Sequence, residues 1–108
     1  MALISTQAMS TAGAAVSYSA VAASDTFAAG NGRTFVHIKN AGASSDTVTV
    51  VAPGTVGPSL AIADLTFAVA NGAEKFVGPI DPAVFGSDGI VTITHSYQTS
   101  VTCAVVQI

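Results

Sequence analysis

The fold class is indicated most clearly by residues 64–77, which run DLTFAVANGAEKFV. Strand-forming residues flank the pair Asn71-Gly72, and Asn-Gly favours a two-residue type I′ hairpin turn because both residues accept positive φ. A two-residue loop also fixes the strand register, so we expect Phe67 to lie opposite Phe76. The stretch therefore predicts an antiparallel β-hairpin.

A second hairpin is expected at Asn31-Gly32, where the same two residues separate two strand-like runs. The same register argument places Phe27 opposite Val36.

Further strands are predicted by the alternation of apolar and polar residues in residues 46–51 and 90–97. A period of two is typical of a strand with one buried face. The side chains expected to face the core are Val48, Val50, Val91, Ile93 and Tyr97.

The last run, residues 100–107, is apolar on both faces and needs cover on both sides. One face carries Val101, Cys103 and Val105, and the other carries Ala104 and Val106. We expect that a second sheet covers one side and a neighbouring subunit the other.

Two Pro- and Gly-containing segments separate these runs. Residues 52–63 are predicted to form a long exposed loop, and residues 78–82 a corner whose prolines are excluded from a central strand. Short strands between such turns predict an all-β fold. We expect an antiparallel β-sandwich or a jelly-roll-like barrel of about seven or eight short strands.

The chain divides into residues 1–23, an N-terminal arm or first strand, and residues 24–108, a single β-sandwich domain. The first 23 residues contain no charged side chain. Two alternatives stay open: residues 14–22 form a strand of the same domain, or the segment lies on an adjacent subunit, chiefly through residues 1–13. No basic residue precedes Arg33, so we expect no secretory signal peptide.

Composition favours assembly with other polypeptides. The 108 residues are 50% hydrophobic and only 8% charged, with a net charge of −3. Ordinary domains contain roughly 25% charged residues, and so few charges favour self-association. Three scattered basic residues do not form a phosphate-binding face, so no nucleic-acid partner is expected. No apolar run is long enough for a membrane helix, and a single cysteine permits no disulfide within the chain.

Catalytic and metal-binding patterns are not found. His37 and His95 stand alone in predicted strands and are expected to be surface or edge residues. If the last two strands pair across residues 98–99, His95 lies opposite Thr102 and Cys103 points to the other face. The aspartates lie at turns and strand starts, where they bond to nearby backbone. We therefore expect no enzyme activity, no metal and no cofactor.

Four segments carry a resemblance to a known family. They run GRTFVHIKN (32–40), TVTVVAPG (47–54), FVGP (76–79) and VTITHS (91–96). In the residue types of these segments and in their order along the chain, residues 25–108 resemble the small head-decoration (cement) proteins of tailed bacteriophages. The resemblance implies a structural virion protein on the capsid exterior. It would bind the major capsid protein and itself, in many cases as a homotrimer.

The expected contacts are the N-terminal arm, the 52–63 loop and the outer face of the last strand. The candidate interface residues are Leu3, Ile4, Met9, Val56, Leu60, Ile62, Val101 and Val105. One alternative is a β-sandwich module that binds carbohydrate or a cell surface, although such modules favour exposed Trp and this chain has none. Another alternative is a tail-tube or head–tail joining subunit.

Overall fold

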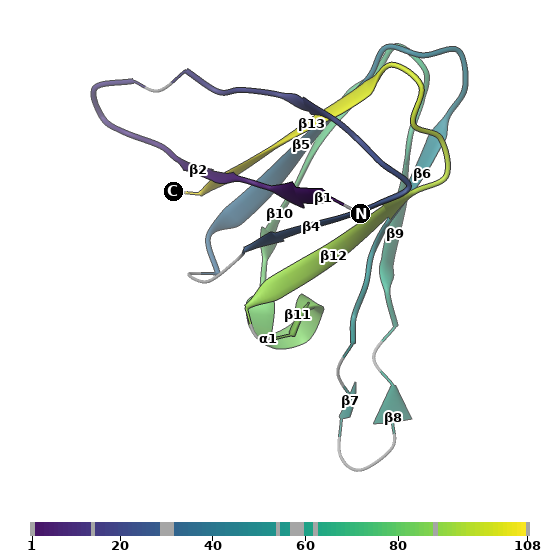
Figure 1. Ribbon diagram of the computed structural model, residues 1–108. Helices are drawn as coiled ribbons and strands as arrows, with labels where there is room; N and C mark the ends of the chain where they lie inside the picture. Colours follow the sequence, from purple (N-terminus) through teal and green to yellow (C-terminus); the bar gives the residue numbers. More distant parts are fainter. Residues whose placement is uncertain are drawn as a thin grey trace.

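Two β-sheets dominate the computed structural model, which describes residues 2–13, 15–28, 32–53, 55–56, 60–61, 63–87 and 89–107 (Figure 1). Sheet A contains, in spatial order, β1 (Ala2–Ile4), β4 (Ser24–Ala28), β12 (Ile90–His95), β6 (Asp46–Val50) and β9 (Leu65–Val69), with β11 (Gly86–Ser87) paired to β12. Sheet B contains β10 (Glu74–Ile80), β5 (Thr34–Asn40), β13 (Val101–Gln107) and β2 (Thr6–Ala8), with β3 (Ser19–Ala20) paired to β13. The remaining elements are the short hairpin β7 (Thr55–Val56) and β8 (Leu60–Ala61) and the helical turn α1 (Pro82–Phe85).

The all-β prediction is confirmed, but strand number and direction differ from the expectation. The described residues contain more strands than seven or eight, because the N-terminal region and the 52–63 segment add short ones. β1 runs parallel to β4, and β2 runs parallel to β13. Both sheets are therefore mixed.

One hydrophobic core draws buried side chains from both sheets. Its members include Phe27, Val48, Val50, Val69, Val91 and Ile93 from sheet A and Val36, Ile38, Ile80, Val101 and Val105 from sheet B. The inward positions predicted for β6 and β12 are confirmed, and Tyr97 packs against the core while partly buried. The Cα radius of gyration is 13.8 Å, close to the ~13 Å of a compact domain of this size.

The Asn71-Gly72 turn forms, but it does not close a hairpin. The N–H of Ala73 donates to the carbonyl of Ala70 at 3.0 Å, and of the two central residues only Gly72 has positive φ, +77°. A type I′ turn needs positive φ at both. A turn with positive φ only at its second central residue does not match the twist of a two-stranded ribbon.

The two strands that flank this turn belong to different sheets. β9 pairs with β6, where Phe67 lies opposite Val48, and β10 pairs with β5, where Phe76 lies opposite His37. The predicted Phe67–Phe76 pair is therefore wrong. The end of β5 stabilises the crossing, because the backbone N–H and C=O of Asn40 both bond to the turn, at 2.9 and 2.7 Å.

The hairpin expected at Asn31-Gly32 is also wrong, because β4 lies in sheet A and β5 in sheet B. Phe27 pairs with Val91 of β12 and not with Val36. Residues 29–31, which include the Asn31 of the predicted turn, lie outside the described residues.

β13 is apolar and buried on both faces, as predicted, while cover by a neighbouring subunit stays a prediction. Val101, Cys103 and Val105 lie in the core, and Ala104 and Val106 are buried on the opposite face. The pairing with residues 90–97 that was considered for this strand does not occur, because β12 lies in sheet A and β13 pairs with β5, β2 and β3.

Short strands within the first 23 residues pair with later strands of the same chain. β1 extends sheet A, β2 extends sheet B, and the expected strand within residues 14–22 is the two-residue β3. Between β2 and β3 runs a segment that we call the strap, residues 9–18 except residue 14. The side-chain amide of Gln7 closes its base, bonding to the backbone O and N of Ser17 at 2.8 and 2.9 Å. An arm on an adjacent subunit stays a prediction.

The two predicted loops both contain strand. In the 52–63 segment, β7 and β8 pair as a hairpin that projects from the body of the molecule (Figure 1). Pro79 lies inside β10, contrary to expectation, but β10 is an edge strand whose register shifts between Val77 and Ile80. A bulged edge is where a strand tolerates proline. Within the described residues, no helix combines the length and hydropathy that crossing a membrane would require.

Candidate interaction site

Both histidines are buried on strands inside their sheets, so the prediction of surface or edge histidines is wrong. His37 lies on β5 and His95 on β12. Each imidazole is hydrogen-bonded to an acidic side chain from a neighbouring strand. These bonds offset the free-energy cost of burying a polar group.

The His95 imidazole forms the shorter of these contacts. Its Nδ1 donates to Oδ2 of Asp46 at 2.6 Å, and both side chains are fully buried. The other carboxylate oxygen of Asp46 accepts the backbone N–H of Tyr97 at 3.1 Å. The local backbone partner expected for Asp46 is therefore wrong, because the carboxylate connects β6 to the end of β12.

Within the part of the chain that the structure describes, no nucleophile completes this Asp–His pair. A base of this kind needs a nucleophile within hydrogen-bond reach of its free nitrogen. Among the described residues, Nε2 of His95 has no hydrogen-bond partner. No group of His, Cys, Asp and Glu side chains in the same part of the chain could hold a metal ion. The geometry supports a structural link between strands.

Cys103 and Asp25 are buried in the centre of the molecule. One carboxylate oxygen of Asp25 accepts the N–H of Ala22 at 3.0 Å, the local bond predicted for this residue. Burial raises the pKa of the Cys103 thiol from 9.0 to about 12, and the negative charge of Asp25 adds to the rise. The thiol is therefore protonated at neutral pH and behaves as a small hydrophobe.

We expect stability to fall in alkaline solution because of Cys103. Between pH about 9 and about 12 the unfolded thiol ionises while the folded thiol keeps its proton. The unfolded state then binds fewer protons, so this group lowers the free energy of unfolding by about 1.4 kcal/mol per pH unit. Urea unfolding across this range should show a weaker pH slope in Cys103→Ala. Equal slopes in the two proteins would contradict the shift.

A second cluster lies on the outer face of sheet B, the face turned away from the core. Nε2 of His37 donates to Oε1 of Glu74 at 3.0 Å, and the hydroxyl of Tyr18 is hydrogen-bonded to Nδ1 at 2.6 Å. The ring of Phe76 stacks on the imidazole at a centroid distance of 4.0 Å. Nζ of Lys39 lies 4.1 Å from the centroid of the Tyr18 ring. These contacts attach one end of the strap to the sheet.

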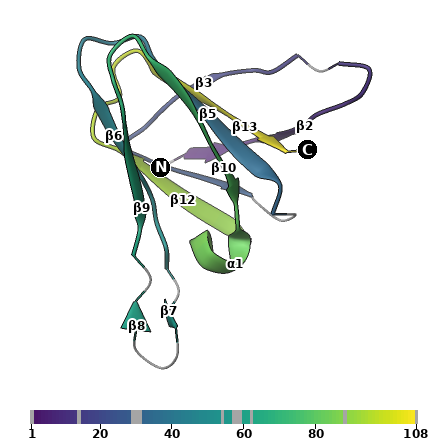
Figure 2. The ribbon, with the colours of Figure 1, turned by 180° about the vertical axis from the view of Figure 1, so that it is seen from behind.

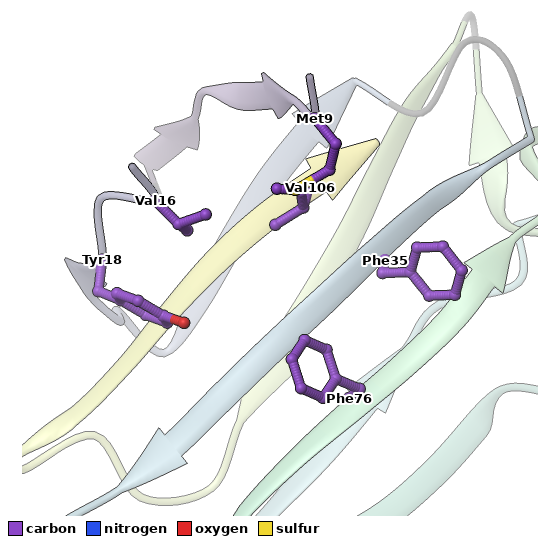
Figure 3. Close-up of a pocket in the computed structure, with 6 residues that line it drawn as sticks. All are labelled: Met9, Val16, Tyr18, Phe35, Phe76 and Val106. Atoms are coloured by element: carbon purple, nitrogen blue, oxygen red, sulfur yellow. The ribbon is translucent and has the colours of Figure 1, made fainter. Parts of the chain in front are cut away.

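An apolar groove lies beside this cluster, between the strap and sheet B (Figure 3). Its volume is about 400 Å³. We call this cavity the outer groove. It is lined by Met9, Val16 and Tyr18 from the strap, Phe35 from β5, Phe76 from β10 and Val106 from β13. Two apolar side chains of the groove are exposed to solvent, Phe76 at 70% and Met9 at 42%.

The structure distributes the predicted interface residues over different environments. Leu3 is 71% exposed on β1, and Met9 lines the outer groove. Ile4, Val101 and Val105 lie in the core, so these three side chains are inaccessible to a partner and their assignment to an interface is corrected. The outward residue of the last strand at the groove is Val106. Val56 and Leu60 belong to β7 and β8, whose side chains are outside the described set, as is Ile62.

Sequence reasoning missed most of the outer groove. Tyr18, Phe35 and Phe76 come from separate segments that only the sheet B pairing brings together. The available signal was alternation, because Phe35 and His37 share one face of β5 and Val106 lies on the second apolar face of β13. That second face had been expected to need cover, and the strap provides part of it.

Comparison of the chain with models of protein families, with curated proteins and with solved structures found no match.

Proposed function

We propose that this chain is a structural virion protein, a decoration protein on the exterior of a tailed-bacteriophage capsid. In this role it binds the major capsid protein and stabilises the shell through protein–protein contacts. It also binds copies of itself, and the family resemblance favours a trimer.

The observation that supports this role is the outer groove on a chain with only 8% charged residues. Exposed apolar patches, especially those rimmed by polar residues, mark interaction sites on proteins. Burying apolar surface contributes roughly 25 cal/mol per Å². The exposed side chains of Phe76, Met9 and Leu3 therefore provide a driving force for docking, and the projecting β7–β8 hairpin adds a second contact surface.

We also assign the two sheets to the β-sandwich class and not to a closed barrel. The two sheets share one core. Each sheet path ends, within the described residues, in strands that pair on one side only. A barrel would leave no such edges.

Docking through the outer groove predicts that Phe76→Ser and Met9→Ser weaken binding to capsid shells about tenfold or more. Removing an exposed anchor at the centre of an interface typically costs more than about 1–2 kcal/mol. The measurement is co-sedimentation of the purified chain with shells assembled from the major capsid protein of the same virus.

The matched control for this experiment is Ile90→Ser, which changes a 38% exposed apolar residue on sheet A, away from the groove. We expect it to bind shells like the unchanged chain. Cryo-electron microscopy of the shells should place the protein on the outer surface. No binding would refute the decoration role, and density only on tail or joining rings would favour the tail-tube alternative.

A carbohydrate- or cell-surface-binding module is the second candidate. The exposed ring of Phe76 and the partly exposed ring of Tyr18 flank one groove, and sugars stack on such rings. A glycan array that gives a clear hit, abolished by Phe76→Ser, would favour this candidate over the capsid role.

A further inference from the structure

The ends of the two sheets differ in how they are protected. An edge strand presents unpaired N–H and C=O groups on which another strand can pair, and proteins protect such edges with charge, proline, bulges or short length. In sheet B, β10 has Lys75, Pro79 and a shifted register, and β2 has only three residues. In sheet A, β1 also has three residues. β9, at the other end of sheet A, has none of these protections.

β9 is regular and uncharged over its whole length. Its five residues, LTFAV, pair with β6 in an unbroken antiparallel register from Asp46 opposite Val69 to Val50 opposite Leu65. Figure 2 shows β9 at the margin of the molecule, continuing toward the projecting hairpin. The side chains of Thr66 and Ala68 are exposed, and Phe67 is half-buried.

The hydrogen bonds of β6 identify the unpaired groups of β9. The C=O of Thr47 accepts from Ser96 at 3.1 Å and the N–H of Val51 donates to Thr92 at 3.0 Å, so these odd-numbered residues direct their backbone groups toward β12. Backbone direction alternates along a strand. The even-numbered residues of β6 therefore bond to Leu65, Phe67 and Val69. The backbone groups of Thr66 and Ala68 point away from sheet A.

We propose that β9 pairs antiparallel with β9 of a second copy of this chain about a two-fold axis at Phe67. In this register Thr66 of each copy lies opposite Ala68 of the other. All four outward-pointing residues of the two strands then form hydrogen-bonded pairs, which continue sheet A across both copies. The two Phe67 rings meet as a cross-strand aromatic pair.

The charges on the strand favour a second copy as the partner. A two-fold axis places each residue near its own counterpart, so a charged edge would bring like charges together. β9 contains no charged residue, and in this register Asp64 lies opposite Ala70. Self-pairing therefore introduces no like-charge contact along the strand. The inference is independent of the capsid role and of a trimer, because β9 lies at the edge of sheet A and the outer groove lies on sheet B.

The test uses two double variants of the chain, one that adds positive charges to β9 and one that adds negative charges. Thr66→Lys/Ala68→Lys places two lysines opposite two lysines in a homodimer, and Thr66→Glu/Ala68→Glu does the same with glutamates. We expect each variant alone to dissociate at least about tenfold more readily than the unchanged chain, because like charges directly opposite destabilise a pair. An equimolar mixture should recover the dimer, because each lysine then faces a glutamate.

Light scattering coupled to size exclusion, over a concentration series up to millimolar, measures the association. Ala68→Pro is a third variant, because the N–H that it removes points outward and takes no part in the ladder with β6. It should also be monomeric while keeping the β circular-dichroism signal. An unchanged chain that stays monomeric at the highest concentration would refute the inference. So would variants that associate as the unchanged chain does, or a mixture that stays monomeric.

Discussion

Replacing Asp46 with alanine should lower the free energy of unfolding by about 3–5 kcal/mol, the loss typical of a broken buried pair. The carboxylate is fully buried and accepts from both His95 and the backbone of Tyr97. Because Nε2 of His95 has no hydrogen-bond partner among the described residues, the substitution leaves the whole imidazole buried without one. Urea denaturation at neutral pH, followed by circular dichroism, measures the change.

Asp64→Ala is the matched control for this substitution. Asp64 also accepts a backbone N–H, from Ala52 at 2.7 Å, but its side chain is exposed to water. We expect a loss of only about 0.5–1.5 kcal/mol. Equal losses for Asp46→Ala and Asp64→Ala would show that the buried link between β6 and β12 contributes no special stability.

Replacing Phe27 with alanine should be as damaging, lowering the free energy of unfolding by about 3–5 kcal/mol. Phe27 is fully buried on β4, between β1 and β12, and is one of the largest side chains of the core. Truncation removes its apolar contacts and leaves a cavity that rigid neighbouring strands fill only in part. The same denaturation experiment applies.

Phe76→Ala changes the same residue type at a site that is 70% exposed. Its stacking on His37 contributes little to folding, and we expect a loss below about 1 kcal/mol. A large loss at Phe76 would mean that the outer face of sheet B supports the fold and is not free for a partner.

Local periodicity accounts for the parts of the fold that the sequence predicted. Alternation of Val48 and Val50 with threonines, and of Val91 and Ile93 with threonines, identified the buried faces of β6 and β12. A strand's pleat depends only on adjacent residues, so this signal needs no knowledge of the partner strand.

Strand pairing was mispredicted because the Asn-Gly signal is equally local. The pair Asn71-Gly72 does form a turn, but Asn40 bonds to it from a strand far away in sequence. Those bonds compete with a ladder between β9 and β10. No property of residues 64–77 alone distinguishes a hairpin turn from a crossing between two sheets.

Partners distant in sequence also explain the missed histidine contacts. His95 bonds to Asp46 across 49 residues, and His37 bonds to Glu74 across 37. The alternation that placed Val91 and Ile93 in the core also places His95 there. The alternation therefore predicts a buried imidazole at His95, even though histidine is polar. A buried imidazole needs a hydrogen-bond partner, and here that partner is acidic.

The pairing of β2 with β13 has a consequence for the order of events during synthesis. Residues 6–8 leave the ribosome well before the residues with which they pair, 105–107. β5 also pairs with β13, so this part of sheet B cannot form until β13 has been synthesised. Contacts of such long sequence separation form slowly, and domains fold vectorially as the chain emerges. The nascent chain must therefore remain partly open until residues 101–107 have emerged.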